Sequence, residues 1–236
     1  MITFLTDVRG KLAHILKIYL EKRAYKKLNQ NKEVSAILAK ATLSTGCDYT
    51  DYLALYSYIR THKPTEVLEL GSGLTTSLIA QALKENGGGR LTSMEDVEKY
   101  YQITLDGIPP DLKPFIDLRL SPAIEGRYGP FCGVMYRDIP DRPYDFVLID
   151  GPYHDAEKSF NLDILHILEK TTRPLTAYID SRTGSCFIYH LVLGTKFSFN
   201  YLERFGVIDN ATSKDLKNYR RIVSDSMRRR EFKRRW

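Results

Sequence analysis

A glycine-spaced turn preceded by an acid is the first place in the sequence that could carry chemistry. Glu69 stands two residues before Gly71, and Gly73 follows after Ser72. The two glycines let the backbone bend sharply and let a ligand approach without meeting a Cβ atom. An acid beside such a turn suits a ligand that carries a positive charge. The stretch therefore indicates a binding turn for a nucleotide-like ligand.

Further carboxylates follow apolar runs farther along the chain. Glu95 and Asp96 come after one run, while Asp150 and Asp180 end two others. Carboxylates accept hydrogen bonds from hydroxyl groups and can act as general bases. Glu95 lies 22 residues after Gly73, close to the spacing of roughly 20 residues at which an acid meets ribose hydroxyls in nucleotide-binding folds.

The elements that must position these groups alternate between strands and helices. Strands are expected at 66–70, 90–94, 115–120, 145–150 and 175–180, and helices at 75–86, 97–105, 156–170 and 185–193. The first of these helices is expected to begin with Thr75 or Thr76 as its N-cap and to end at the three glycines that start at Gly87. Residues 125–142 are expected to form a hairpin or irregular excursion, and residues 196–210 two antiparallel strands.

This alternation predicts an α/β fold. We expect a doubly wound, seven-stranded, mostly parallel sheet with an antiparallel C-terminal strand, helices on both faces and an N-terminal helical extension. Because parallel strands end at the same edge of a sheet, Glu69, Glu95, the loop at Ser121, Asp150 and Asp180 should collect there.

The domain organisation follows from the pattern of elements. Residues 1–60 are expected to form an N-terminal helical extension or lid with helices at 8–28, 33–43 and 48–60, and residues 61–212 the main domain. Residues 213–236 are expected to form a basic tail, disordered from 228 onward. The first helix combines apolar residues at helical spacing with many lysines, which fits either a solvated helix packed on the domain or a helix that faces a membrane surface.

Charge and composition narrow the class of protein. Residues 1–40 carry a net +6 and residues 214–236 a net +7, so the part between them carries −7. The chain has no run of about 18 apolar residues and no basic leader with an apolar block, so we expect neither a membrane span nor a secretory signal. Cys47, Cys132 and Cys186 are odd in number and lack Cys-x-x-Cys spacing. They favour a reducing compartment, and hence a cytoplasmic protein.

Three motifs in order resemble a known family. Glu-x-Gly-x-Gly at 69–73, Met-Glu-Asp at 94–96 and Tyr-Asp-Phe-Val-Leu-Ile-Asp-Gly-Pro at 144–152 are similar to motifs I, II and IV of the class I S-adenosylmethionine-dependent methyltransferases, over residues 64–210. The Ile-Asp-Gly-Pro form looks like the branches that act on small molecules and sugars. The resemblance implies an O-methyltransferase for a small molecule or glycan, with S-adenosylmethionine held by Glu69, Gly71, Ser72, Gly73, Thr75, Thr76, Glu95, Asp96, Ser121, Ala123 and Asp150.

The resemblance also implies which residues could act in catalysis. Methyl transfer from a sulfonium needs positioning, and a base when the acceptor is a hydroxyl. Asp150 is the best-placed base, although the same carboxylate could cap a helix or contact the cofactor, and His154 is the second candidate. Metal-dependent members place carboxylate ligands near the positions of Asp150 and Asp180, which implies Mg²⁺. Ser181 departs from that pattern, because the family has an asparagine there.

Two alternatives stay open at this point. Asp150-Gly151-Pro152-Tyr153 differs by one residue from the Asp-Pro-Pro-Tyr motif of methyltransferases that act on bases, and together with the basic tail it fits a nucleic-acid partner. The other alternative is a non-catalytic binding protein that keeps the fold. A nicotinamide-dependent oxidoreductase is disfavoured because Thr76 occupies the place of the third glycine. The oligomeric state is not indicated.

Overall fold

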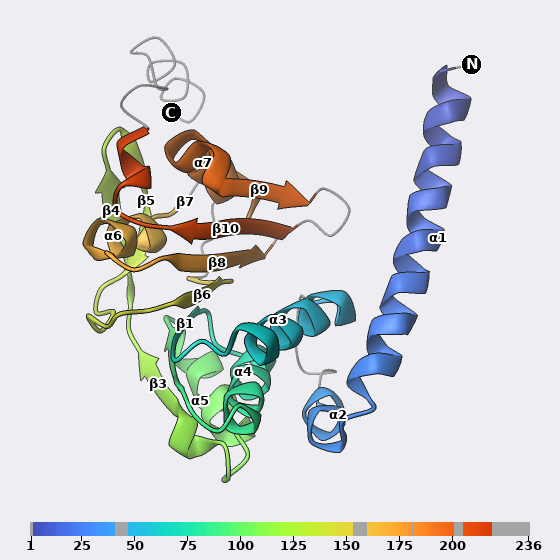
Figure 1. Ribbon diagram of the computed structural model, residues 1–236, viewed down its shortest axis with the longest axis horizontal. Helices are drawn as coiled ribbons and strands as arrows, with labels where there is room; N and C mark the ends of the chain where they lie inside the picture. The colour runs from blue at the N-terminus through green and yellow to red at the C-terminus, as the bar shows by residue number, and fades with distance from the viewer. Residues whose placement is uncertain (1, 41–46, 153–159, 181, 201–204, 219–236) are drawn as a thin grey trace.

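The computed structural model describes residues 2–40, 47–152, 160–180, 182–200 and 205–218, with side chains from residue 14 to residue 216. Seven strands form the main sheet (Figure 1): β1 Glu66–Leu70, β2 Arg90–Glu95, β3 Ile116–Leu120, β6 Phe146–Ile149, β8 Leu175–Asp180, β9 Phe197–Asn200 and β10 Phe205–Ala211. Their order is β3-β2-β1-β6-β8-β10-β9. Within this order, β3, β2, β1, β6 and β8 pair in parallel, and β10 pairs antiparallel with its neighbours β8 and β9. The predicted sheet, including its antiparallel C-terminal strand, is confirmed.

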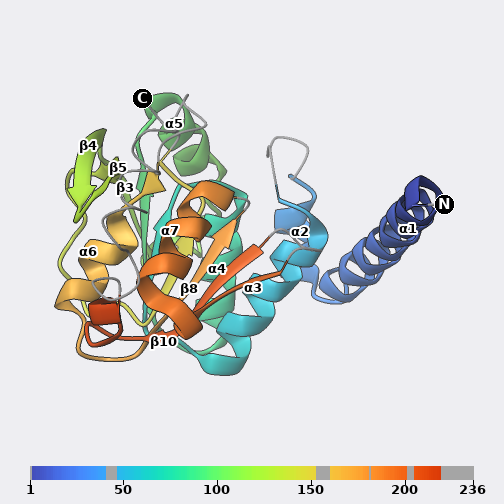
Figure 2. The same cartoon turned by 90° about the horizontal axis from the view of Figure 1, so that it is seen from above.

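The helices cover both faces of this sheet. They are α1 Ile2–Leu28, α2 Lys32–Leu38, α3 Tyr49–His62, α4 Leu74–Glu85, α5 Glu98–Gly107, α6 Asp163–Lys170 and α7 Thr183–Leu193, with 3₁₀ turns η2 Lys113–Phe115, η3 Gly194–Lys196 and η4 Asp215–Asn218. Side chains alternate between faces along β1. Leu68 and Leu70 pack into the core beneath α6 and α7, whereas Val67 packs against α3 and α4. Figure 2 shows α6 and α7 on the opposite side of the sheet from α3.

The segment expected to be a hairpin or an irregular excursion contains a hairpin, which belongs to a small second sheet. This sheet contains β4 Ala123–Tyr128, β5 Phe131–Tyr136 and β7 Phe160–Asn161, where β4 and β5 form an antiparallel hairpin and β7 joins β5 in parallel. The β5–β7 contact needs a glycine on β5. A Cβ atom at Gly133 would lie 2.2 Å from the Phe160 carbonyl oxygen.

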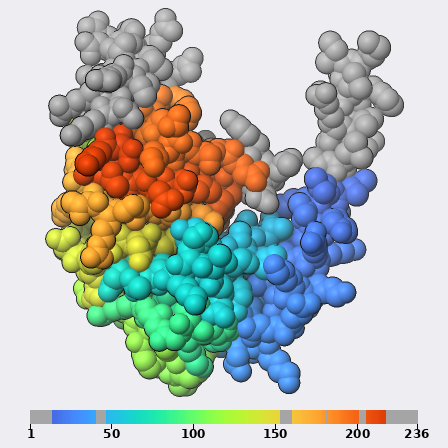
Figure 3. Space-filling model, viewed as in Figure 1, coloured from blue at the N-terminus to red at the C-terminus, as the bar shows by residue number. Residues whose placement is uncertain are grey.

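The N-terminal helices pack against α3 and α4, so the expected helical extension is present. Leu28 of α1 and Val34 and Leu38 of α2 form one apolar cluster with Tyr52 of α3 and Leu78 of α4. Figures 1 and 3 show α1 running from this cluster away from the sheet. None of the described helices combines the length and the apolar character needed to cross a bilayer.

Three local predictions differ from the structure. The N-cap of α4 is Gly73 rather than Thr75 or Thr76, because both threonine hydroxyls donate instead to the buried Glu69 carboxylate. The helix expected at 156–170 begins only at Asp163, since β7 precedes it. The second helix ends at Leu38, and residues 41–46 lie outside the described residues. The end of α4 matches its prediction, with Gly87 at a positive φ of 85° after the C-cap.

Candidate functional site

Two glycine turns meet at the edge of the sheet where β1, β2, β6 and β8 end, which we call the carboxyl edge. Gly71 follows β1 with a φ of +97°, and Gly151 follows β6. A Cβ atom at Gly71 would lie 2.7 Å from the Gly151 nitrogen, and one at Gly151 would lie 2.5 Å from the Gly71 nitrogen. The Asp150 N–H also donates to the Leu70 carbonyl at 2.8 Å. The two turns therefore touch backbone to backbone, which only glycines allow.

Glu69 lies inside the protein beneath the first turn. Its side chain is 0% exposed. The hydroxyl of Thr75 donates to one carboxylate oxygen at 2.6 Å, and those of Thr76 and Ser93 donate to the other at 2.6 and 2.5 Å. Burial raises the pKa of Glu69 to about 7, the three hydroxyls oppose that rise, and the charge of Glu95 adds to it. Glu69 thus fixes the turn and the start of α4 from within.

Glu95 at the end of β2 faces the same turn. One of its carboxylate oxygens accepts from the Ser72 N–H at 3.1 Å and from the Ser72 hydroxyl at 2.8 Å. The other accepts from the N–H groups of Asp96 and Val97 at 3.1 and 3.0 Å. The Ser72 hydroxyl also lies 3.1 Å from the Thr104 hydroxyl of α5. The predicted offset between Gly73 and Glu95 therefore brings the acid against the glycine turn.

The loop after β3 joins this group. The Ser121 N–H donates to the Glu95 carbonyl at 2.8 Å, and the Ser121 hydroxyl accepts from the Asp138 N–H at 3.1 Å. Ala123 starts β4 opposite Tyr136 of β5. Ser121 thus lies beside Glu95, and Ala123 marks the point where the chain turns into the hairpin.

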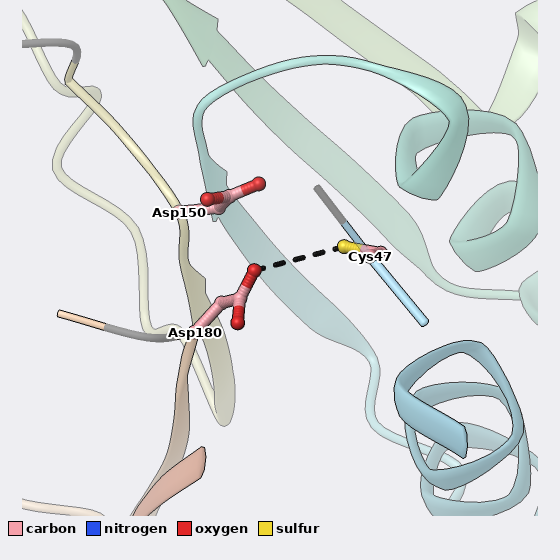
Figure 4. A group of neighbouring side chains, drawn as sticks. All are labelled: Cys47, Asp150 and Asp180. Carbon is pink, nitrogen blue, oxygen red and sulfur yellow. Dashed lines mark hydrogen bonds between the residues drawn. The ribbon is translucent and has the colours of Figure 1, made fainter. Parts of the chain in front are cut away.

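Asp150 and Asp180 end neighbouring strands, and a cysteine from the N-terminal part of the chain meets them (Figure 4). One ligand atom from each of Cys47, Asp150 and Asp180 lies within 4.8 Å of those of the other two. The Cys47 thiol donates to Asp180 across 3.8 Å. Burial, and then the charges of Asp150 and Asp180, raise the pKa of that thiol. Asp150 is exposed to solvent. Its pKa is nevertheless raised to about 7, first because the nearby protein removes water from the carboxylate and then because of the charge of Asp180.

The Cys47 position depends on the N-terminal helices. Glu21 of α1 accepts from the N–H groups of Tyr49 and Thr50 at 2.8 and 3.2 Å, and so caps the start of α3. Asp51 in the first turn of α3 accepts from the Asp48 N–H at 2.9 Å. Burial raises the pKa of Asp51 to about 7, and the charge of Asp180 contributes. The extension thus adds a thiol and an acid to the carboxyl edge.

Arg182 holds the second turn in place. Its guanidinium donates to the carbonyl oxygen of Pro152 at 3.1 Å and to that of Asp150. Its Nε atom is buried without a hydrogen-bond partner among the described residues. Because both bonds go to backbone carbonyls, Arg182 holds the backbone of the turn and not its side chains.

The sequence indicated some of these residues and missed others. The structure brings Glu69, Gly71, Ser72, Gly73, Thr75, Thr76, Glu95, Asp96, Ser121, Asp150 and Asp180 to one edge. His154 and Ser181 lie outside the described residues. Cys47, Asp51 and Arg182 were not identified as site residues. The only sequence signal for them was their position. Cys47 and Asp51 lie near the start of the helix that precedes β1, and Arg182 follows the end of β8.

Comparison with known proteins agrees with this geometry at the level of the fold. No protein-family model and no curated protein sequence matches the chain. A methyltransferase structure from Geobacter sulfurreducens aligns with a TM-score of 0.52 at 13% identity, over 77% of this chain and 90% of that one. A candidate caffeoyl-CoA O-methyltransferase structure from Staphylococcus aureus aligns with a TM-score of 0.55 at 14% identity, over 78% of this chain and 94% of that one.

The chain has a methyltransferase fold. At such low identity the similarity establishes the architecture and leaves the activity to be argued from the site. The predicted fold class is therefore confirmed by both the sheet order and these two alignments.

Proposed function

We propose that the chain is an S-adenosylmethionine-dependent O-methyltransferase that acts on a hydroxyl of a small molecule or glycan. The observation that carries this proposal is the meeting of the Gly71–Gly73 turn with Glu95 and Asp150 at one edge of the sheet. In open α/β sheets, ligands bind outside the carboxyl ends of the strands, where the strand order reverses. Here β1 and β6 flank that reversal.

The residues at the edge fit the cofactor in shape and in charge. A Cβ atom at Gly73 would meet no described atom within 4 Å, so a ligand can approach the backbone there. The carboxylates of Glu95, Asp150 and Asp180 give the edge a negative potential, which favours a sulfonium and an ammonium group. When bound, the cofactor supplies a methyl group that is already activated for transfer.

Different residues would hold the cofactor and shape its site. Glu95 and Ser72 are placed to meet the ribose hydroxyls, and Gly71 and Gly73 allow the methionine part to pass close to the backbone. Glu69 acts with Thr75 and Thr76 as a positioning group, because it is 0% exposed and lies inside the protein beneath the turn. Ser121 borders the region that the adenine ring would occupy.

Asp150 is the proposed general base. Its carboxylate is exposed at the end of β6, and Arg182 fixes the backbone that carries it. It would take the proton of an acceptor hydroxyl as the oxygen forms its bond to the methyl carbon and the carbon–sulfur bond breaks. Cys47 and Asp51 border the same space, so the N-terminal extension is placed to contribute to acceptor selection.

Asp150 and Asp180 could also hold a divalent metal. Their oxygens and the Cys47 sulfur form a three-ligand group, and two carboxylates suit Mg²⁺. The thiol is softer than Mg²⁺ prefers and would favour Zn²⁺ or Fe²⁺ if it were deprotonated. With a metal bound, these residues would orient a pair of acceptor oxygens. Metal titration of the wild type and of Asp180→Asn separates this use of the carboxylates from general-base catalysis alone.

We further propose that α1 contacts an anionic membrane surface. Ile15 and Tyr19, one helical turn apart, are 63% and 60% exposed, and Lys22 and Lys26 continue the same face. Ala24 and Leu28 on another face pack against the body. Apolar and basic residues on the outward face of a helix suit the headgroup region of an anionic bilayer. Co-sedimentation with phosphatidylserine vesicles tests this, and Ile15→Glu/Tyr19→Glu should abolish it if α1 is the contact.

Calorimetry and an acceptor panel test the enzymatic proposal. The wild type should bind S-adenosylhomocysteine in a saturable way, Gly73→Val should bind it at least about 10-fold more weakly, and Gly88→Val serves as a control because a Cβ there meets no described atom. No binding at millimolar ligand would overturn the proposal and favour a non-catalytic protein. Methyl transfer to RNA or DNA in preference to catechols and sugars would favour the nucleic-acid alternative.

A further inference from the structure

A cavity lies among the loops that enter strands at the end of the sheet opposite the glycine turns. Its volume is about 490 Å³, within the range of about 300–1,000 Å³ typical of small-molecule sites. The loop that enters β6 and the loop that enters β8 border it, together with α6 and the end of β5. Figures 1 and 2 show α6 lying beside the β4–β5 hairpin. We call this side of the sheet the amino edge.

Positive charge dominates the lining of this cavity. Four cationic residues border it, against two acids: Arg137, Arg142, Lys170 and Arg173, and Asp141 and Asp163. This balance is the reverse of that over residues 41–213, which carry a net charge of −7. A cluster of cations within an otherwise acidic domain indicates a place where a negative ligand is stabilised.

Three of the four cations form no ion pair with another described residue. Arg142 contacts Asp117 at 3.3 Å and Glu66 at 3.8 Å, so its charge is already paired. None of the ion pairs between described residues involves Arg137, Lys170 or Arg173. Lys170 lies in the last turn of α6 and complements the negative end of that helix. Neither Arg137 nor Arg173 lies in the last turn of a described helix.

The acids in the lining do not cancel this charge. Asp163 accepts from the Tyr136 N–H at 3.0 Å and from the Asn161 amide at 2.7 Å, so both of its oxygens are turned to internal partners. It is 1% exposed, and burial raises its pKa to about 7. Asp141 is exposed on the loop. Asp141 is thus the one exposed acid in the lining, and the four cations outnumber it.

Apolar side chains also line the cavity. Met135, Ile139, Ile167 and the buried ring of Tyr144 are among them. Apolar side chains combined with a few charged groups are the usual composition of sites for small organic ligands. A ring or short chain can pack on these side chains while its anionic group meets Arg137, Lys170 and Arg173.

We propose that this cavity binds a small organic anion that carries a phosphate group on an apolar body. Arginine and lysine bind phosphate through charge-assisted hydrogen bonds. The inference goes beyond the proposed methyl transfer and does not depend on it, because Arg142, Lys170 and Arg173 lie in the loops that enter β6 and β8 or at the end of α6, whereas the glycine turns follow β1 and β6.

Calorimetry of the full chain with phenyl phosphate tests the proposal. The difference in affinity between phenyl phosphate and inorganic phosphate measures what the apolar side chains of the lining contribute. The wild type should bind phenyl phosphate saturably and more tightly than inorganic phosphate. Lys170→Glu/Arg173→Glu should weaken binding at least about 10-fold. Lys22→Glu/Lys32→Glu is the matched control, since it makes the same change of net charge at exposed positions of α1 and α2.

Three outcomes would overturn the proposal. They are no saturable binding of phenyl phosphate by the wild type up to about 10 mM, equal weakening by the two double variants, and unchanged affinity in Lys170→Glu/Arg173→Glu. The milder Lys170→Gln/Arg173→Gln variant gives the same test if the charge reversal unfolds the chain. Binding of S-adenosylhomocysteine by the same samples keeps this result separate from the enzymatic proposal.

Discussion

The two edges of the main sheet differ in what holds them together. At the carboxyl edge, the turns after β1 and β6 touch through their backbones, and buried acids accept hydrogen bonds from neighbouring hydroxyl and N–H groups. At the amino edge, longer side chains such as Arg142 pair with acids near the surface. The first edge is held by backbone contacts and carries exposed acids, and the second is held by side-chain ion pairs beside a cavity that cations line.

This difference suggests a division of roles. A site that must orient a reaction gains from fixed backbone geometry, because small misplacements of the reacting groups are costly. A site that only has to attract an anion can rely on flexible lysine and arginine side chains. Fixed backbone geometry requires glycines at set positions, so the carboxyl edge has a motif that is visible in the sequence. Lysine and arginine side chains can reach the amino edge from many positions, so that edge has no motif.

The largest expected effect concerns the contact between the two turns. Gly71→Val places a side chain against the Gly151 backbone and at a positive φ, so the turns must separate. We expect a loss of more than about 3 kcal/mol of unfolding free energy and no measurable binding of S-adenosylhomocysteine. Urea denaturation and calorimetry measure both, with Gly88→Val as control. Near-normal stability and binding would show that the backbone contact does not define this edge.

The next largest effect is the loss of stability when one charged residue is removed from each edge. Glu69→Ala leaves the hydroxyls of Thr75, Thr76 and Ser93 without their acceptor, so we expect a loss of about 2–4 kcal/mol. Arg142→Ala removes ion pairs whose members are each partly exposed and should cost about 1 kcal/mol. Urea unfolding of both variants ranks them. The reverse order would contradict the inference that buried hydrogen-bonded acids stabilise the carboxyl edge more than ion pairs stabilise the amino edge.

Thermal stability should depend on pH through one buried acid near each edge. The pKa values of Glu69 and Asp163 are raised to about 7 from ordinary values of 4.5 and 3.8. The folded protein keeps these protons where the unfolded chain has released them, so the unfolding free energy falls as the pH rises through this range to about 7. The melting temperature should therefore be higher at pH 6 than at pH 8.

Amide variants identify the groups responsible for this pH dependence. Glu69→Gln and Asp163→Asn should each reduce it, because the replaced side chain no longer titrates, while Asp51 and Asp150, whose pKa values are also raised to about 7, keep their share. Wild-type pH dependence in both variants would assign the effect to other groups. Differential scanning calorimetry at several pH values makes the comparison.

The smallest expected effect is communication between the two edges. Asp163 borders the amino-edge cavity and accepts from Asn161, whose amide also donates to the Gly151 carbonyl at 3.1 Å. Saturating phenyl phosphate should therefore change the affinity for S-adenosylhomocysteine by about 2- to 5-fold, with the reciprocal change in phenyl phosphate affinity. Identical affinities with and without the second ligand would mean that the two edges act independently.

The sequence predicted the parts of the fold that local pattern determines. Alternating apolar runs and glycine punctuation predicted β1, α4, β2, β6 and β8 and the meeting of Glu95 with the glycine turn. The start of α6 was missed because β7 forms only through a contact with β5, which is distant in sequence. The domain boundaries at residues 60 and 212 stay predictions, and residues 219–236 of the tail lie outside the described residues.

The site shows the same limit. Glu69 was predicted to meet the cofactor, but nothing in the spacing of the residues shows that three hydroxyls enclose it. Cys47 and Arg182 reach the carboxyl edge only through tertiary packing, since neither belongs to a motif. The amino-edge cavity was not predicted at all, because its cations come from separate segments that the fold brings together.

The backbone contact between Gly71 and Gly151 has a consequence for the history of the chain. A side chain at either position would occupy the space of the other turn, so the two glycines form a single heritable unit although 80 positions separate them. Sequences that diverge almost everywhere else should therefore keep glycine at both positions.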